Sequence, residues 1–282
     1  MDGAIDDTTR RIVEFATGMA FADLPPEIVA QASMRVLDSV ACALASADAD
    51  PVRIALSTSF GTGGEGRVIG RPDLRLAPDA AAFVNTSMIR YFDFNDWAPN
   101  GHPSDVIGAL LALADQPGVD GRRFLTATVV AYEVFIALTE ATKLPALGWD
   151  QGFALGLAAV AGLGNMLALD ESTVANALGV MAVAGLPTGA ARSGSLSMWK
   201  GCATGYATRN AVFATQLAGA GLTGPPAAFE GRRGLWALVT GPFELTLGGD
   251  TLRLSRTALK PWPACYHGQA AIEAALELRK RV

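Results

Sequence analysis

Apolar residues recur along this chain at the spacing of amphipathic helices, and the pattern predicts a mostly helical protein. The clearest stretch starts after Leu24-Pro25-Pro26-Glu27, where proline suits a first helical turn. From there apolar positions return every three or four residues as far as Leu44. Thr8 or Thr9 is expected to cap an earlier helix. Further helical patterns cover residues 80–91, 103–113, 121–139, 152–169, 171–185, 196–219 and 269–281.

The pattern changes near the end of the chain. Residues 243–247 and 251–255 alternate between apolar and polar around Gly248-Gly249-Asp250, which predicts a β-hairpin. A short strand is also predicted at residues 67–69, after a glycine-rich turn at 61–66. We therefore predict a mainly α fold, with a large all-helical domain over residues 1–222 and a connection over 223–242. Residues 243–282 would begin a smaller α+β domain, which is incomplete because one hairpin and one helix make a poor core.

Composition excludes several classes of protein. Half of the residues are apolar, 17% are charged, and the net charge is −5. Because no basic stripe is present, nucleic acid is not expected as a partner. The longest apolar stretch, residues 153–169, is at the lower limit of about 17 residues for spanning a bilayer, so we expect buried helices and no membrane partner. The widely spaced Cys42, Cys202 and Cys265 predict reduced thiols in a cytoplasmic protein, without a metal site.

The two histidines of the chain both lie in dense polar clusters. The first cluster, residues 91–105, puts Asp93, Asp96 and His102 in one loop between two predicted helices. A carboxylate beside an imidazole fixes its tautomer and raises its basicity, as acid–base catalysis requires. The backbone N–H groups of the helical turn that follows, including Ser104, would suit a bound carboxylate. Equally, Asp93 and Ser104 could be helix caps and His102 a turn residue.

Two lysine-containing segments are the other candidates. Lys200 lies in an otherwise apolar, small-residue helix, where its ammonium could bind a substrate carboxylate or donate a proton. Residues 260–267 bring Lys260, Tyr266 and His267 within eight positions, stiffened by two prolines. Alternatively, Lys200 could be a surface lysine that extends its ammonium into solvent, and residues 260–267 could be a stiff surface loop.

At these same residues the chain resembles the MmgE/PrpD family, which includes 2-methylcitrate dehydratase, cis-aconitate decarboxylase and an iminodisuccinate epimerase. The resemblance runs over nearly the whole chain. It rests on motifs at residues 93–96, 102–107, 131–134, 197–203, 223–225, 229–231 and 259–263. It implies a helical first domain and a smaller α/β domain in a homodimer, with an active site between the domains and neither metal nor organic cofactor.

The resemblance also implies roles for single residues. By motif match, Asp93, His102, Lys200 and Lys260 fall on the family's active-site positions. Asp96 is adjacent in its motif, and Tyr266 and His267 are weaker matches. Together with Ser104, these three are predicted to bind substrate.

Two departures from the family pattern argue against a decarboxylase. Asp150-Gln151 follows Gly148-Trp149 where some members have a histidine, and Trp97 or a gap replaces a threonine that some decarboxylases carry. Family members also continue well past position 282.

The resulting expectation is a cofactor-free hydro-lyase that acts on a small di- or tricarboxylic acid such as 2-methylcitrate. His102 would move a proton next to a carboxylate, oriented by Asp93 or Asp96, and Lys200 and Lys260 would stabilise the charge that develops. The alternatives are an epimerase, isomerase or decarboxylase of a related acid, and an inactive, truncated scaffold that binds anions without turnover.

Overall fold

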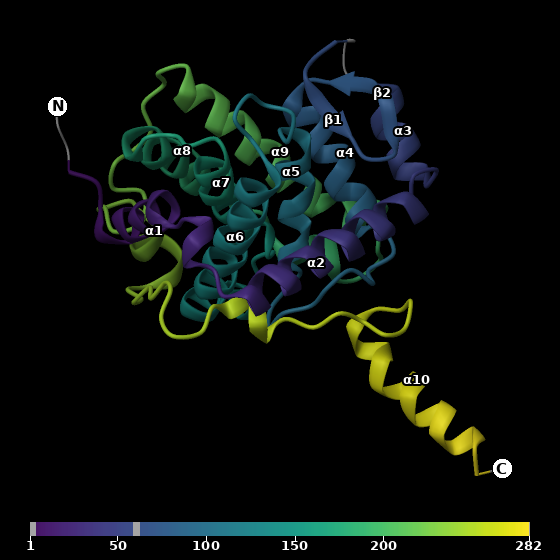
Figure 1. The fold of residues 1–282 in the computed structure, drawn as a ribbon. Coiled ribbons are helices and arrows are strands. Elements are labelled where there is room, and N and C mark those ends of the chain that lie inside the picture. Colours follow the sequence, from purple (N-terminus) through teal and green to yellow (C-terminus); the bar gives the residue numbers. More distant parts are fainter. Residues whose placement is uncertain (1–3, 59–62, 282) are drawn as a thin grey trace.

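The computed structural model describes residues 4–58 and 63–281, and it shows a bundle of helices from which the last helix projects (Figure 1). The predicted glycine-rich turn at 61–66 therefore lies partly outside the described residues. The α-helices are α1 (Asp7–Gly18), α2 (Pro26–Ala45), α3 (Asp50–Thr58), α4 (Pro78–Arg90), α5 (Ile107–Ala112), α6 (Gly121–Thr142), α7 (Gly152–Met166), α8 (Glu171–Ala184), α9 (Trp199–Gly219) and α10 (Tyr266–Arg279). The prediction of a mainly α fold is confirmed.

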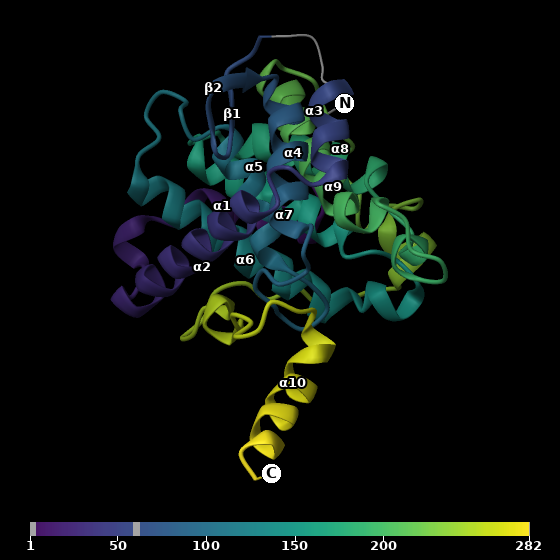
Figure 2. The ribbon, with the colours of Figure 1, turned by 90° about the vertical axis from the view of Figure 1, so that its right-hand side faces the viewer.

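Helices α6 and α7 form the centre of the core. Helix α6 packs against α7, α7 against α9, and α9 against α4. Every residue of α7 except Asn165 is buried, and Asn165 donates from Nδ2 to the carbonyl oxygens of Ala16 (2.7 Å) and Met19 (2.9 Å). Figure 2 shows α1 and α2 towards the outside of the bundle. The long apolar pattern at residues 152–169 is thus a central helix of the fold.

Small residues allow the closest of these helix contacts. A Cβ atom at Gly205 of α9 would lie 2.6 Å from Ser87 Oγ and 2.9 Å from the carbonyl oxygen of Phe83, both on α4. Glycine therefore lets the two backbones approach closely. This contact matters for function because α4 and α9 deliver residues of the candidate site.

Aspartates cap three of the helices. Asp120 accepts a hydrogen bond from Arg123 N at 2.8 Å, and Asp170 accepts one from Thr173 N at 2.7 Å. The prediction that Thr8 or Thr9 caps the first helix is wrong, because the cap is Asp6. Its Oδ1 accepts from Thr9 N at 2.9 Å, and its Oδ2 accepts from backbone N–H groups of residues 229 and 230.

The predicted hairpin at 243–255 is wrong. Among the described residues this segment contains no strand, and a 3₁₀ helix (Arg253–Arg256) ends it. The backbone N–H groups of Gly248 and Arg253 donate instead to the buried carboxylate of Glu133 on α6, at 3.0 and 2.7 Å. Leu245 and Leu254 are buried in the main core. The Glu133 carboxylate therefore binds backbone N–H groups that a hairpin would have paired, and the main core buries the apolar side chains. The division into two domains stays a prediction.

Other elements were predicted in part or not at all. The short strand predicted at 67–69 is β1 (Gly66–Val68), which pairs antiparallel with β2 (Arg71–Leu76). Strand β2 has no alternating apolar pattern, and its first three residues are exposed. Helix α3 was likewise not predicted.

Within residues 4–58 and 63–281, two helices, α2 and α6, are long and apolar enough to cross a membrane by length and composition alone. In α6, 78% of the apolar window is buried inside the fold, as in the core helix of a soluble protein; in α2 the share is 33%.

Candidate active site

The loop between α4 and the 3₁₀ helix Pro103–Val106 holds the first polar cluster, as predicted. Asp93 has a left-handed backbone with φ of 59°, which is uncommon for a residue other than glycine. Trp97 N donates to the carbonyl oxygen of Ala258 at 2.8 Å, and Ala258 N donates back at 2.9 Å. This pairing joins the loop to the segment that carries Lys260, although the two are far apart in sequence.

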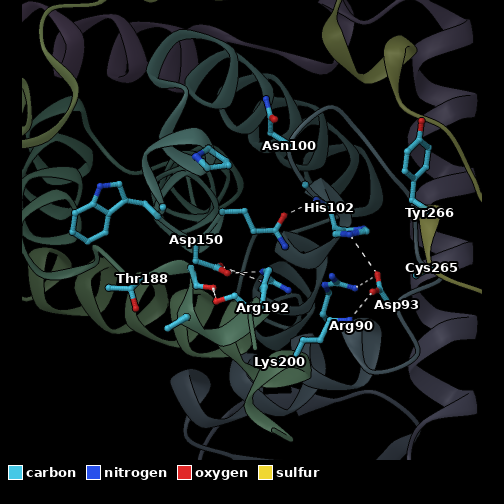
Figure 3. A pocket seen from close by; sticks show the side chains of 18 of the residues that line it. Arg90, Asp93, Asn100, His102, Asp150, Thr188, Arg192, Lys200, Cys265 and Tyr266 are labelled. Carbon is cyan, nitrogen blue, oxygen red and sulfur yellow. Dashed lines mark hydrogen bonds and ion pairs between the residues drawn. The ribbon is translucent and has the colours of Figure 1, made fainter. Parts of the chain in front are cut away.

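Asp93 is the centre of a cluster of cations. Its Oδ1 lies 2.6 Å from Arg90 Nη1 and 3.6 Å from Lys260 Nζ, and its Oδ2 lies 3.4 Å from Lys200 Nζ. Nε2 of His102 lies 3.6 Å from Oδ1. The structure therefore brings His102, Lys200 and Lys260 together around the Asp93 carboxylate. Figure 3 shows Asp93 joined to Arg90, His102 and Lys200 by dashed lines.

The ring of His102 is held by backbone and side-chain hydrogen bonds. Its Nδ1 lies 2.7 Å from the carbonyl oxygen of Asp96, which can only accept, so Nδ1 carries the hydrogen. Its backbone N donates to Gln151 Oε1 at 2.8 Å. In the neutral ring the free lone pair is then on Nε2, which faces Asp93.

The charges around this cluster shift several pKa values. Burial lowers the pKa of His102 well below its ordinary value of 6.5, and the charges of Arg90 and Lys260 lower it further. Burial tends to raise the pKa of Asp93, but Arg90 together with His102 and Lys260 outweighs it and holds the pKa well below the ordinary range. Burial also lowers the pKa of Lys260, although Asp93 opposes this shift. The site thus favours a neutral imidazole beside an ionised carboxylate.

The two lysines occupy different positions. Lys200, in the first turn of α9, lines the cavity beside Asp93, and its side chain is 35% exposed. The Lys260 side chain is only 2% exposed, and its Nζ donates to the carbonyl oxygen of Asp93 at 2.6 Å. Lys260 is not among the described residues that line the cavity. It therefore supports Asp93 from behind, whereas Lys200 can reach a ligand.

Asp96 and Ser104 are fully buried and do not line the cavity in the described part of the chain. Asp96 Oδ1 accepts a hydrogen bond from Ser104 N at 3.1 Å. The idea that the amides after His102 seat a substrate carboxylate is therefore wrong at Ser104, because the chain's own carboxylate already occupies that amide. Burial raises the pKa of Asp96.

The cluster opens into a cavity of about 1010 Å³. Tyr266 and His267, in the first turn of α10, line it together with Cys265. The Tyr266 ring stacks on Trp97 with centroids 3.9 Å apart and planes 4° apart. This stacking holds the start of α10 in the lining of the cavity.

Sequence reasoning missed three charged residues that line this cavity, Arg90, Asp150 and Arg192. Arg90 was hidden inside a helical pattern, although it lies three residues before Asp93. Asp150 was noted only as a departure from the family pattern. The Asp150 side chain is fully buried, and its Oδ2 lies 2.5 Å from Arg192 Nε. The ion pair between Asp150 and Arg192 gives no signal in one sequence, because the two residues are 42 positions apart.

Most of the chain is similar to known proteins. Residues 10–248 match the MmgE/PrpD N-terminal domain. The chain is 30% identical to a 2-methylcitrate dehydratase of Escherichia coli (strain K12), over 74% of this chain and 47% of that protein. It is 31% identical to an alkylcitrate dehydratase of a fungal species, over 73% of this chain and 45% of that protein. It is 29% identical to a cis-aconitate decarboxylase of Aspergillus terreus, over 76% of this chain and 46% of that protein.

The chain thus spans about half the length of the curated relatives it matches. The relatives named here are dehydratases and a decarboxylase, all of them lyase-type enzymes. Since the domain match covers most of the chain, this protein belongs to the MmgE/PrpD family.

Proposed function

We propose that this protein is a cofactor-free hydro-lyase that removes water from a small di- or tricarboxylic acid such as 2-methylcitrate. The observation that carries the proposal is the arrangement around Asp93: a buried imidazole at 3.6 Å and the Lys200 ammonium at 3.4 Å, both lining one cavity. Such a site offers a base and a cation next to each other, which proton removal beside a carboxylate requires.

In this proposal His102 is the general base. Its Nε2 takes the proton from the carbon next to a substrate carboxylate, because Nδ1 already donates its hydrogen to Asp96 O. Ionised Asp93, 3.6 Å away, stabilises the imidazolium that forms. A carbon–carbon double bond then forms as the carbon–oxygen bond to the hydroxyl group breaks. The imidazolium returns its proton to the departing hydroxyl, so that water leaves and His102 is neutral again.

Lys200 has a different role in this proposal. Its ammonium binds the carboxylate next to the reacting carbon and stabilises the enediolate charge that develops there. Arg90 and Lys260 keep Asp93 ionised and in place, because they contact its carboxylate and, in the case of Lys260, its backbone oxygen. The absence of a cofactor and a cytoplasmic location are part of the same proposal.

The test is an assay of this chain with 2-methylcitrate and with citrate, following the new double bond by ultraviolet absorbance. We expect turnover by the wild-type chain and a loss of about 10²–10⁴-fold in His102→Gln, the usual contribution of a general base. Lys200→Met should lose activity as well, whereas Lys280→Met, which removes an exposed lysine just after α10, should not.

Other outcomes point to the other chemistries. Exchange of the substrate α-hydrogen for solvent deuterium without water loss would identify an epimerase, and release of carbon dioxide a decarboxylase. Binding of the acids without any of these reactions would contradict the proposal and leave an anion-binding scaffold.

A further inference from the structure

A second pair of charged residues, Asp150 and Arg192, lies on two hydrogen-bonded loops that line the cavity. Asp150 N donates to the carbonyl oxygen of Pro187 at 2.9 Å, and Gly189 N donates to that of Gly148 at 2.7 Å. These bonds join the loop before α7 to the loop before the 3₁₀ helix Gly189–Arg192. Because the loops are joined, Asp150 and Arg192 are held together although they are 42 residues apart in sequence.

Asp150 fixes the orientation of the Arg192 guanidinium. Its Oδ2 accepts from Arg192 Nε at 2.5 Å, and its Oδ1 accepts from Arg192 Nη2 at 3.3 Å. Oδ1 also accepts from Gly152 N at 2.8 Å, at the start of α7. The carboxylate is thus anchored to a core helix, and the pair is drawn with dashed lines in Figure 3. An anchored guanidinium loses little freedom when it binds a planar anion.

Hydrogen-bonding capacity remains on Arg192 after this pairing. A guanidinium has five N–H groups, and the pair with Asp150 uses two of them. Nη1 of Arg192 is buried and has no partner among the described residues, which is costly unless a ligand supplies one. The side chain as a whole is 25% exposed and lines the cavity. Arg192 therefore keeps N–H groups that can donate to a ligand in addition to its ion pair with Asp150.

Arg192 has no ion pair with Asp93 in the described structure, so it is separate from the cluster at His102. Arg192 nevertheless lines the same cavity as Asp93 and His102. Burial raises the pKa of Asp105, and the charge of Arg192 is among those that oppose this shift. One ligand in this cavity could therefore contact both Arg192 and the cluster at His102. A ligand with a single carboxylate could satisfy one of them only.

We propose that Arg192, oriented by Asp150, binds a second carboxylate of the substrate, remote from the carbon that His102 deprotonates. Arg192 then selects di- and tricarboxylic acids over monocarboxylic acids. This inference rests on the proposed function in that it uses the same cavity, but it concerns binding and does not need turnover.

The experiment compares the affinity of propane-1,2,3-tricarboxylate, measured by calorimetry, with that of butanoate, measured by ligand-observed NMR. Arg192→Gln should weaken tricarboxylate binding by about tenfold to a hundredfold, the range for hydrogen bonds between charged groups. Butanoate binding should change by less than about twofold, since it uses only the Lys200 side of the cavity. Arg192→Lys, which keeps the charge but loses the fork of donors, should weaken the tricarboxylate by an intermediate factor.

The matched control is Arg209→Gln. Arg209 also pairs with an aspartate, Asp79, at 3.0 Å between Nε and Oδ2, but it lies outside this cavity. The Arg209→Gln variant should leave the affinities for the tricarboxylate and for butanoate unchanged. If Arg192→Gln binds the tricarboxylate like the wild type, or loses both ligands equally while still folded by circular dichroism, the proposal is overturned. If the affinities change as expected but the wild-type chain shows no turnover, only the proposed function is contradicted. If the wild-type chain turns over substrate but Arg192→Gln binds the tricarboxylate with unchanged affinity, only this inference is contradicted.

Discussion

Asp93 combines a strained backbone with an unusual number of cationic neighbours. A left-handed conformation costs a residue other than glycine about 1–3 kcal/mol and persists only where the surroundings enforce it. Here Arg90 and Lys200 hold the carboxylate, and Lys260 holds the backbone oxygen. The strain therefore fits a residue placed for its chemistry, at the point where three segments of the chain meet.

The pKa of His102 leads to a prediction on pH dependence. Because burial and the nearby cations lower this pKa well below 6.5, the imidazole stays neutral and able to accept a proton in mildly acidic solution. The acid limb of the kcat/KM profile, which reports the free enzyme, should therefore lie below pH 6.5. Lys260→Met removes one of the lowering charges and should move that limb upward, whatever it does to the maximal rate. A wild-type limb at or above pH 6.5 would contradict this assignment.

At the residue scale, local sequence chemistry identified much of this cluster. Asp93, His102 and Lys200 were recognised because polar residues are rare and concentrated in this apolar chain. Arg192 was not, because its signal is the contact with Asp150, which only folding creates.

The helices follow from periodicity, whereas the terminal segment does not. Residues 243–255 alternate as a hairpin would, yet Glu133 on α6 binds their backbone. Alternation records only which side chains face an apolar surface; it does not say whether that surface is a strand partner or a helix bundle.

The contact at Glu133 gives a prediction at the scale of the element. The Glu133 side chain is fully buried and pairs with the Arg253 guanidinium, which is 15% exposed, in addition to the two backbone N–H groups. Glu133→Gln keeps the shape but removes the charge, and should lower the free energy of unfolding by about 3 kcal/mol, as when a buried pair is broken. Urea denaturation measures this, and limited proteolysis should show earlier cleavage within 243–260.

Glu140→Gln is the matched control. Glu140 pairs with Arg253 and Arg256 but is 30% exposed, so its loss should cost about 1 kcal/mol or less. Equal losses for the two variants would argue against Glu133 as the anchor of this segment.

At the scale of the whole molecule, α10 stands apart from the bundle (Figure 1), and none of its residues is buried. Its first turn nevertheless lines the cavity through Tyr266 and His267. The candidate site therefore draws on the bundle and on a helix that the bundle hardly covers.

The family resemblance implies a homodimer, which remains a prediction for this chain. Large apolar side chains are exposed on the described surface, among them Leu37 on α2 and Phe213 on α9, and a second copy could cover such groups. We expect light scattering to give twice the mass of one chain at micromolar concentration. A monomeric mass that persists as concentration is raised would contradict the prediction.

The sequence by itself determined the helical class, most helix positions and the chemistry of the central cluster, because periodicity, proline positions and scarce polar residues are local signals. Only the tertiary structure decided that Lys260 supports Asp93 from behind, that Asp96 occupies the amide expected to bind substrate, and that Asp150 holds Arg192 in the cavity. The physical reason is that charged groups find their partners in three dimensions. Burial then fixes which partner each charged group keeps. Neither the choice of partner nor the burial is encoded in the spacing of residues along the chain.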